Sequence, residues 1–168
     1  LAHALATRKT FPSWGWMLEN GATTLCEVWA GTDGGKSHNH PMFGSISGWF
    51  FRWLGGIQCA EDAVAFDRVV IRPQLVDGLE WVKSSHDTIR GTVASNWSIE
   101  GKERRFEIVV PPTVQATVEL PARDSEVVTE GGVAIADHQE IKTLDAGEGI
   151  KRFELGPGSY QFVVKPAP

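Results

Sequence analysis

The sequence has only two cysteines and one tyrosine among its 168 residues, and it has no long apolar run. Cys26 and Cys59 form neither a CxxC pair nor a disulfide framework, so we expect two buried free thiols. No apolar run reaches the length of a membrane span, and no basic stretch followed by an apolar core marks a signal segment. A membrane partner is not expected. The compartment stays open, with the cytoplasm favoured over the periplasm or the exterior.

A basic cluster is also missing, and the net charge is −5. This charge excludes the usual electrostatic footprint of a nucleic-acid partner. The remaining composition, with 42% hydrophobic and 22% charged residues, is ordinary for a globular protein with one sizeable core. Nothing in it indicates a cofactor.

Tryptophan is the residue in excess, with seven copies. Each indole presents a flat apolar face and one N–H donor, which suits core packing and also suits stacking on a sugar ring. Both interpretations stay open. Five of the seven lie within the first 53 residues: Trp14, Trp16, Trp29, Trp49 and Trp53.

The spacing of apolar residues along the sequence changes after the first third of the chain. Helical spacing is seen in LAHALATRK and again between Phe43 and Ile57, where Pro41 fits the first turn and Gly55–Gly56 the end. The stretch ENGATTLCEVW also admits a short helix with Glu27 in its first turn. We therefore predict an α+β fold, with a helical segment over residues 1–62 and a β domain over residues 63–168.

The β domain is predicted from alternation and from turn residues. Strands are expected in FDRVVIRPQL, LEWVKSSHDTIRGTVASNWSIE, KERRFEIVVPP, VQATVELP and YQFVVKP. Several short strands at close spacing favour an antiparallel β-sandwich. The charges of KERRFE indicate an edge strand that resists further pairing.

The stretch GATTLCEVWAGTDGGKSHNHPMFGSISGW, residues 21–49, concentrates chemically active side chains. His38 and His40 form an HxH pair near Glu27 and Asp33, but no third ligand has the spacing of a zinc site, so no metal is expected. Neither GxSxG nor a Cys–His arrangement with a third group is present, which argues against a nucleophilic enzyme.

Carboxylate chemistry is the stronger possibility. Glu27 lies in sequence among tryptophans, and a carboxylate against indole rings is partly desolvated, as the acid or base of a glycosidase requires. Glu19, eight residues earlier, is a second candidate, which we place among the substrate-binding residues. The alternative is structural, with Glu27 capping a helix or pairing with Arg52.

Three segments carry a family resemblance. FPSWGWMLENGATTLCEVWAG, then SHNHPMFGSISGWFFRWLGGI, then FDRVVIRPQL resemble the C-terminal part of the α-L-rhamnosidases, inverting glycoside hydrolases with an (α/α)6 barrel followed by a β-sandwich. The resemblance covers residues 1–120. It implies that Glu27 is the general base and that His40 contacts rhamnose. It also implies that Trp14 and Trp29 lie near the sugar pocket.

The chain departs from the family pattern at two positions and by one absence. Cys26 and Val28 stand where the family usually has tryptophan and arginine. The family's general acid lies in an upstream motif that nothing in these 168 residues resembles. We therefore expect the last helices of an incomplete barrel plus the sandwich. This piece would be inactive alone and would pair with the missing barrel part or with itself. The alternative is a carbohydrate-binding or structural β-sandwich module without catalysis.

Overall fold

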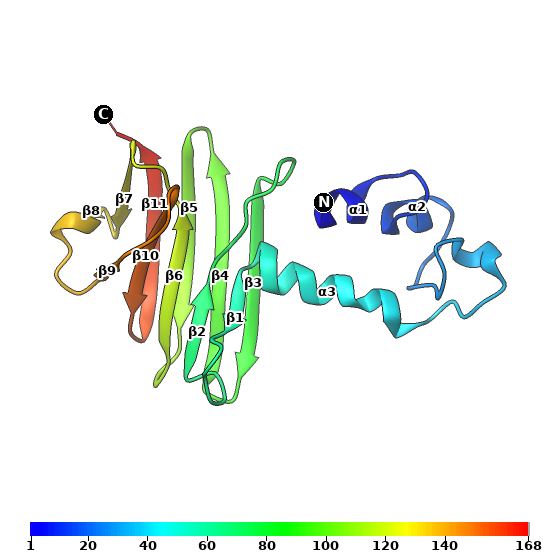
Figure 1. Cartoon of the computed structure of the whole chain (residues 1–168), viewed down its shortest axis with the longest axis horizontal. Helices are drawn as coiled ribbons and strands as arrows, with labels where there is room; N and C mark the ends of the chain where they lie inside the picture. Colours follow the sequence, from blue (N-terminus) through cyan, green and yellow to red (C-terminus); the bar gives the residue numbers. More distant parts are fainter. Residues whose placement is uncertain (168) are drawn as a thin grey trace. The chain divides into compact units, whose positions relative to one another are not determined.

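The computed structural model describes residues 1–167 and divides the chain into two compact units. One unit runs from Leu1 to Phe50 and the other begins at Phe51. In Figure 1 the first unit is blue to cyan and the second, with all of the strands, continues through green to red. The predicted α+β class, with helices first and a two-sheet β domain after them, is confirmed.

The first unit consists of short helices joined by long irregular segments. Three of them are α-helices. Two lie before residue 20, and the third directly follows a 3-10 helix. The elements are α1 (Ala2–Thr7), α2 (Trp14–Glu19), the 3-10 helices η1 (Gly31–Gly34) and η2 (Pro41–Gly44), and α3 (Ser45–Trp49). With the π-helix η3 (Phe50–Leu54), the run from Pro41 to Leu54 reproduces the predicted helix and its proline start.

A buried serine joins the first two helices. The Ser13 Oγ accepts from the Trp16 amide at 2.9 Å and so caps α2, while its hydroxyl donates to the Arg8 carbonyl at 2.6 Å, just beyond α1. Ser13 is fully buried, so both bonds are sheltered from water. The cap explains why a helix begins at Trp14.

The helix expected in ENGATTLCEVW is wrong. Residues 20–30 contain no helix, because the backbone of this segment bonds to residues 37–40 instead of to itself. Near the two ends of this segment, Gly21 and Gly31 have positive φ angles of 84° and 65°, which a right-handed helix does not contain. A tertiary pairing therefore replaced a weak local helical preference.

The second unit is a β-sandwich of two sheets (Figure 1). The five-stranded sheet has the order β1-β2-β6-β10-β9, with β2 and β6 parallel, and the six-stranded sheet has the order β3-β4-β5-β11-β7-β8. The strands of the first sheet are Ile57–Cys59, Arg68–Ile71, Gln115–Pro121, Ile150–Leu155 and Lys142–Leu144, in spatial order. Those of the second are Trp81–Thr88, Gly91–Glu100, Glu103–Val110, Gly158–Pro166, Glu126–Glu130 and Val133–Ala134.

The predicted domain boundary at residues 62–63 stays a proposal. β1 already belongs to the five-stranded sheet, in which Ile57 pairs with Ile71. The two compact units meet at residues 50–51.

The sandwich core lies between the two sheets and consists of alternate residues of the strands. Its largest fully buried side chains include Phe106, Phe153 and Phe162, and the rings of Phe153 and Phe162 stack at 5.5 Å. The Trp97 indole N–H donates to the Leu54 carbonyl at 2.8 Å, a contact within the second unit that joins Leu54 to β4. Burial of these apolar side chains is the main stabilising term of the unit.

Two smaller expectations need correction. β5, which contains KERRFE, is not an edge strand but pairs with both β4 and β11. Its Arg105 lies on the exposed face, while Phe106 and Ile108 face the core. Cys59 is an exposed free thiol, whereas Cys26 is buried as expected. Within residues 1–167, no helix is both long enough and apolar enough to cross a bilayer.

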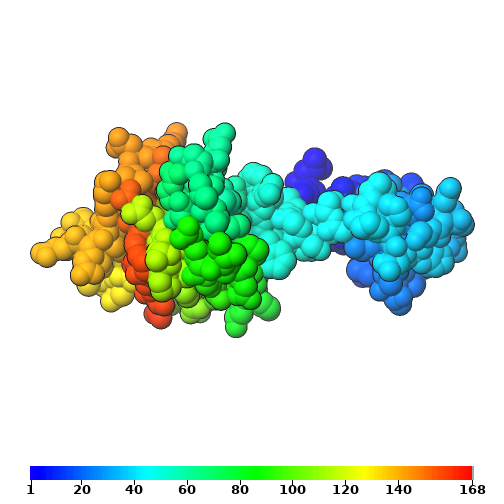
Figure 2. All heavy atoms as spheres, turned by 90° about the horizontal axis from the view of Figure 1, so that it is seen from below, coloured from blue at the N-terminus to red at the C-terminus, as the bar shows by residue number. Residues whose placement is uncertain are grey.

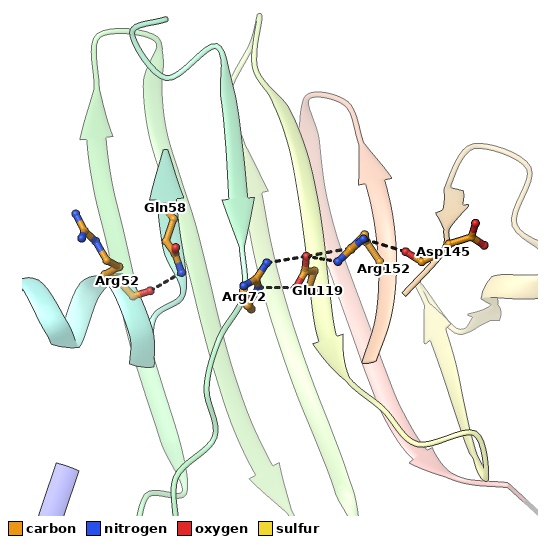
Figure 3. Close-up of polar contacts among 6 residues, drawn as sticks. All are labelled: Arg52, Gln58, Arg72, Glu119, Asp145 and Arg152. Atoms are coloured by element: carbon orange, nitrogen blue, oxygen red, sulfur yellow. Dashed lines mark hydrogen bonds and ion pairs between the residues drawn. The ribbon is translucent and has the colours of Figure 1, made fainter. Parts of the chain in front are cut away.

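A buried carboxylate is held on the outer face of the five-stranded sheet. Glu119 of β6 is 4% exposed, although its neighbours Val118 and Leu120 are the ones that point into the core. Arg72 donates to its Oε1 at 2.9 Å, and Arg152 Nε donates to the same oxygen at 3.0 Å (Figure 3). Arg152 also bonds the Asp145 carbonyl, so the network connects β6 and β10 to the segment that follows β9.

Replacing Glu119 with alanine is expected to lower the free energy of unfolding by about 2–3 kcal/mol, because two arginines then lose their shared anionic partner. Urea unfolding of the 168-residue chain measures the change. Glu154→Ala is the matched control, since Glu154 is half-exposed and its contact with Lys142 is 3.5 Å long. That control is expected to cost at most about 0.5 kcal/mol. Equal losses for the two variants would contradict a structural role for the network.

Candidate active site

Two segments of the first unit lie side by side through backbone hydrogen bonds. The Glu27 amide donates to the Ser37 carbonyl at 2.9 Å, and the His40 amide donates to the Leu25 carbonyl at 2.8 Å. The Thr24 hydroxyl also bonds the His38 carbonyl. The η1 turn between the segments reverses the chain, with Gly35 at φ 63° just after it. This pairing brings the backbone of Glu27 and that of His40 into one strip, although the two residues are far apart in sequence.

The Glu27 side chain is half-buried and has one defined partner. Its Oε2 accepts from the Ser37 amide at 3.2 Å. Within residues 1–167, Oε1 accepts no hydrogen bond, so it is free to accept one from a water molecule. A fixed carboxylate with one free oxygen is the arrangement that a general base needs.

The imidazole of His40 is oriented by the helix that follows it. His40 is the N-cap of η2, and its Nδ1 accepts from the Met42 amide at 3.3 Å. A neutral ring with Nδ1 as acceptor carries its proton on Nε2. The half-buried His40 can therefore donate from Nε2 to a hydroxyl group.

Trp14 and Trp29 form an aromatic cluster with Phe43. The two indoles meet edge to face at 4.8 Å and 87°, and Trp29 lies 4.1 Å from the Phe43 ring. The Trp14 indole N–H donates to the Phe43 carbonyl at 3.2 Å, so the ring is fixed and its donor is already used. Phe43 was assigned by its spacing to the apolar face of a helix only. Its position three residues after His40 is the signal that could have placed it here.

Behind this cluster lies a small core made of Met17, Ala22 and Cys26. Trp29 and Phe43 pack against it, and the Cys26 side chain is fully buried. Val28 fills the space beside Gly34, where an added Cβ would come within 2.4 Å of the Val28 Cγ2 atom. Cys26 and Val28 thus both take part in packing.

Glu19 occupies a different environment. It ends α2, is exposed, and pairs with Lys9 at 2.7 Å. No described contact joins it to Glu27. Its assignment to the substrate-binding residues stays a prediction.

The two histidines do not share a metal-like arrangement. His38 Nε2 lies 3.2 Å from the Thr32 carbonyl, whereas His40 caps η2. In the described part of the chain, no three His, Cys, Asp or Glu side chains gather as a metal site would need. A cavity of about 300 Å³ in this unit is lined mainly by apolar residues, and of the predicted site residues it includes Trp14.

The first unit thus combines a half-buried carboxylate with packed indole rings, and a β-sandwich follows it in the chain. Comparison with known proteins places the chain more closely. Residues 1–54 match the bacterial α-L-rhamnosidase six-hairpin glycosidase domain, and residues 56–134 match the bacterial α-L-rhamnosidase C-terminal domain. The chain belongs to the α-L-rhamnosidase family, in which its first 54 residues match the six-hairpin glycosidase domain and residues 56–134 match the C-terminal domain.

Individual relatives agree with this assignment. The α-L-rhamnosidase of Streptomyces avermitilis is 30% identical over 98% of this chain, which covers 16% of that protein. The structure of the enzyme from Dictyoglumus thermophilum matches 97% of this chain and has 33% identity and a TM-score of 0.84, with 18% of that chain covered. The Streptomyces avermitilis enzyme complexed with L-rhamnose gives a TM-score of 0.80 at 30% identity, over 96% of this chain and 16% of that one. The chain thus spans about a sixth of the length of the relatives that it matches.

Proposed function

We propose that the protein carrying this chain hydrolyses terminal α-L-rhamnosyl groups with inversion at the anomeric carbon. The observation that carries the proposal is the backbone pairing of Leu25–Glu27 with Ser37–His40, in a chain of this family. It brings the backbones of the two residues that carry the carboxylate and the imidazole into the same strip. A related enzyme whose structure contains L-rhamnose supports the substrate class.

In the proposed reaction, Glu27 removes a proton from a water molecule. The water oxygen forms a bond to the anomeric carbon as the bond from that carbon to the leaving oxygen breaks. A carboxylic acid elsewhere in the barrel protonates the leaving oxygen, which completes the proton balance. Inverting glycosidases hold these two carboxyl groups roughly 6.5–9.5 Å apart, which leaves room for the water.

The other site residues bind and orient the sugar. His40 donates from Nε2 to a hydroxyl group, while the faces of Trp14 and Trp29 contact the apolar side of the ring. Glu19 is proposed to bind substrate at the end of α2. No cofactor or metal enters the proposed reaction.

The helical unit is proposed to pack against the preceding part of the barrel, or against a second copy of itself. Its support is the set of large apolar side chains that it exposes. Large exposed apolar patches typically mark association surfaces. The exposed residues of this kind include Phe11, Leu18, Met42 and Phe50.

The 168-residue chain alone is expected to show no hydrolysis of 4-nitrophenyl α-L-rhamnopyranoside, because the acid partner of Glu27 is not among its residues. Release of nitrophenol is measured on the purified chain, with a protein of full family length that carries this chain as the positive control. Robust turnover by the isolated chain would overturn the assignment of the acid to another part of the barrel.

A further inference from the structure

The outer face of the six-stranded sheet carries one large exposed aromatic side chain. Trp81, the first residue of β3, is 62% exposed. Its cross-strand neighbour on β4 is Ser98, which pairs in turn with Arg105 on β5. The next row of the same face contains Lys83, Asn96 and Glu107. Trp81 is therefore an exposed aromatic side chain with polar neighbours on its face of the sheet, and it is not part of the core.

These side chains surround a pocket of about 220 Å³ over β3, β4 and β5. The three strands are green in Figure 2, where they form part of the surface of the β unit. Drug-sized pockets measure roughly 300–1,000 Å³, so this one suits a single ring of a small ligand. The exposed residues that line it are Trp81, Lys83, Glu100, Arg105 and Glu107.

The polar groups of the pocket are held in place by one another. Asn96 Oδ1 accepts from the Ser84 amide at 3.1 Å, and its Nδ2 donates to Glu107 at 3.4 Å. Arg105 donates to Glu100 at 2.8 Å and to Glu103 at 2.7 Å. A second amide proton of Asn96 and the remaining oxygen of Glu107 are still free for a ligand. The face thus offers an oriented donor and an oriented acceptor beside an indole.

The charges of the lining select the kind of ligand. Lys83 and Arg105 are balanced by Glu100 and Glu107, so the pocket has a formal charge of zero. Such a lining offers no net attraction to a phosphate or to an acidic sugar. It also differs from the core of a protein interface, which is depleted in charged residues.

We propose that this pocket is a second carbohydrate site, which binds one neutral pyranose ring of a glycan without catalysis. The apolar C–H face of the ring stacks on Trp81, and its hydroxyl groups bond to Asn96 and Glu107. The site belongs to the β-sandwich and uses none of the residues assigned to hydrolysis. A test of this site is therefore independent of a test of the proposed rhamnosidase reaction.

The test is an NMR titration of the 168-residue chain that follows the indole N–H signals. The Trp81 signal is assigned from its loss in Trp81→Phe. The probes are methyl α-L-rhamnopyranoside, methyl β-D-glucopyranoside and methyl β-D-galactopyranoside, with glucuronate as the charged comparison. At least one neutral glycoside is expected to shift the Trp81 signal to saturation, with a Kd on the order of 1 mM, and more tightly than glucuronate.

Variants separate this site from other causes of a shift. Trp81→Ala, followed through the Lys83 and Ser98 backbone signals, is expected to raise Kd at least about tenfold, or about 1.4 kcal/mol. Phe51→Ala, which removes another exposed aromatic ring, is the matched control and leaves Kd unchanged. Three results would each overturn the proposal: no saturable shift with any neutral probe up to about 50 mM, an unchanged Kd in Trp81→Ala, or tighter binding of glucuronate.

Discussion

Replacing Glu27 with glutamine in a full-length rhamnosidase that carries this chain is expected to lower kcat by about 10²–10⁴-fold, the usual range for loss of a general base. Glutamine keeps the size of the side chain and can still accept from the Ser37 amide, so the fold should be retained. It cannot, however, take a proton from water. Initial rates with 4-nitrophenyl α-L-rhamnopyranoside, together with the circular dichroism of each protein, measure the effect.

The control for this substitution is Glu61→Gln, which removes the same charge from an exposed residue of the β unit. It is expected to leave both kcat and KM unchanged. A Glu27→Gln enzyme with the kcat of the unaltered protein would show that the base lies elsewhere. In that case, the Glu27–Ser37 contact would be structural only.

The substitution Gly56→Ala is expected to lower the free energy of unfolding of the chain by about 3 kcal/mol or more, from backbone strain and overpacking together. Gly56 has a φ of 77°, which L-residues rarely adopt. An added Cβ would lie 2.3 Å from the Arg72 carbonyl carbon and the Pro73 nitrogen. Both contacts are backbone atoms, so no side-chain rotation relieves them. Urea unfolding measures the loss.

Gly78→Ala separates the two contributions. Gly78 has a φ of 88°, yet nothing lies within 4 Å of an added Cβ. It should therefore show the conformational cost alone, about 1 kcal/mol. A loss for Gly56→Ala no larger than that for Gly78→Ala would contradict the close packing of Gly56 against the backbone of Arg72 and Pro73.

The β domain was the more predictable half of the fold. The alternation in KERRFEIVV and VQATVEL survives as β5 and β6, where Phe106, Ile108 and Val118 are buried. Apolar residues at every second position indicate a strand with one face in the core, so the same pattern also predicts which residues are buried. The expected strands did not include β1, β7, β8, β9 and β10. Of these, β9 and β8 have only three and two residues, and so short a run contains no period.

Positions in the sheets were less predictable than the strands themselves. β5 was expected at an edge because of its charges, but it lies inside the sheet, where Arg105 pairs with Glu100 on the outer face and Arg104 pairs with the largely buried Glu126. The parallel pairing of β2 with β6 joins Arg68–Ile71 to Gln115–Val118 across a long sequence separation. Nothing local in the sequence specifies such a pairing.

The candidate site was predicted from family motifs rather than from periodicity. The resemblance to the C-terminal part of the α-L-rhamnosidases is confirmed by the family comparisons. The roles of Glu27 and His40 remain predictions. Their common strip depends on bonds between residues 24–27 and 37–40, which no helical or strand pattern indicates. Local propensity suggested a helix at that point instead.

The central claim is that Glu27 activates the attacking water, and azide rescue tests it most directly. Azide is a nucleophile that needs no deprotonation, so it replaces both the water and the base. In the full-length Glu27→Ala enzyme, added azide is expected to restore the release of nitrophenol from 4-nitrophenyl α-L-rhamnopyranoside. NMR of the product should show β-L-rhamnosyl azide, formed by attack on the face opposite the leaving group. An unimpaired rate in Glu27→Ala without azide, or an α-configured azide product, would contradict the account.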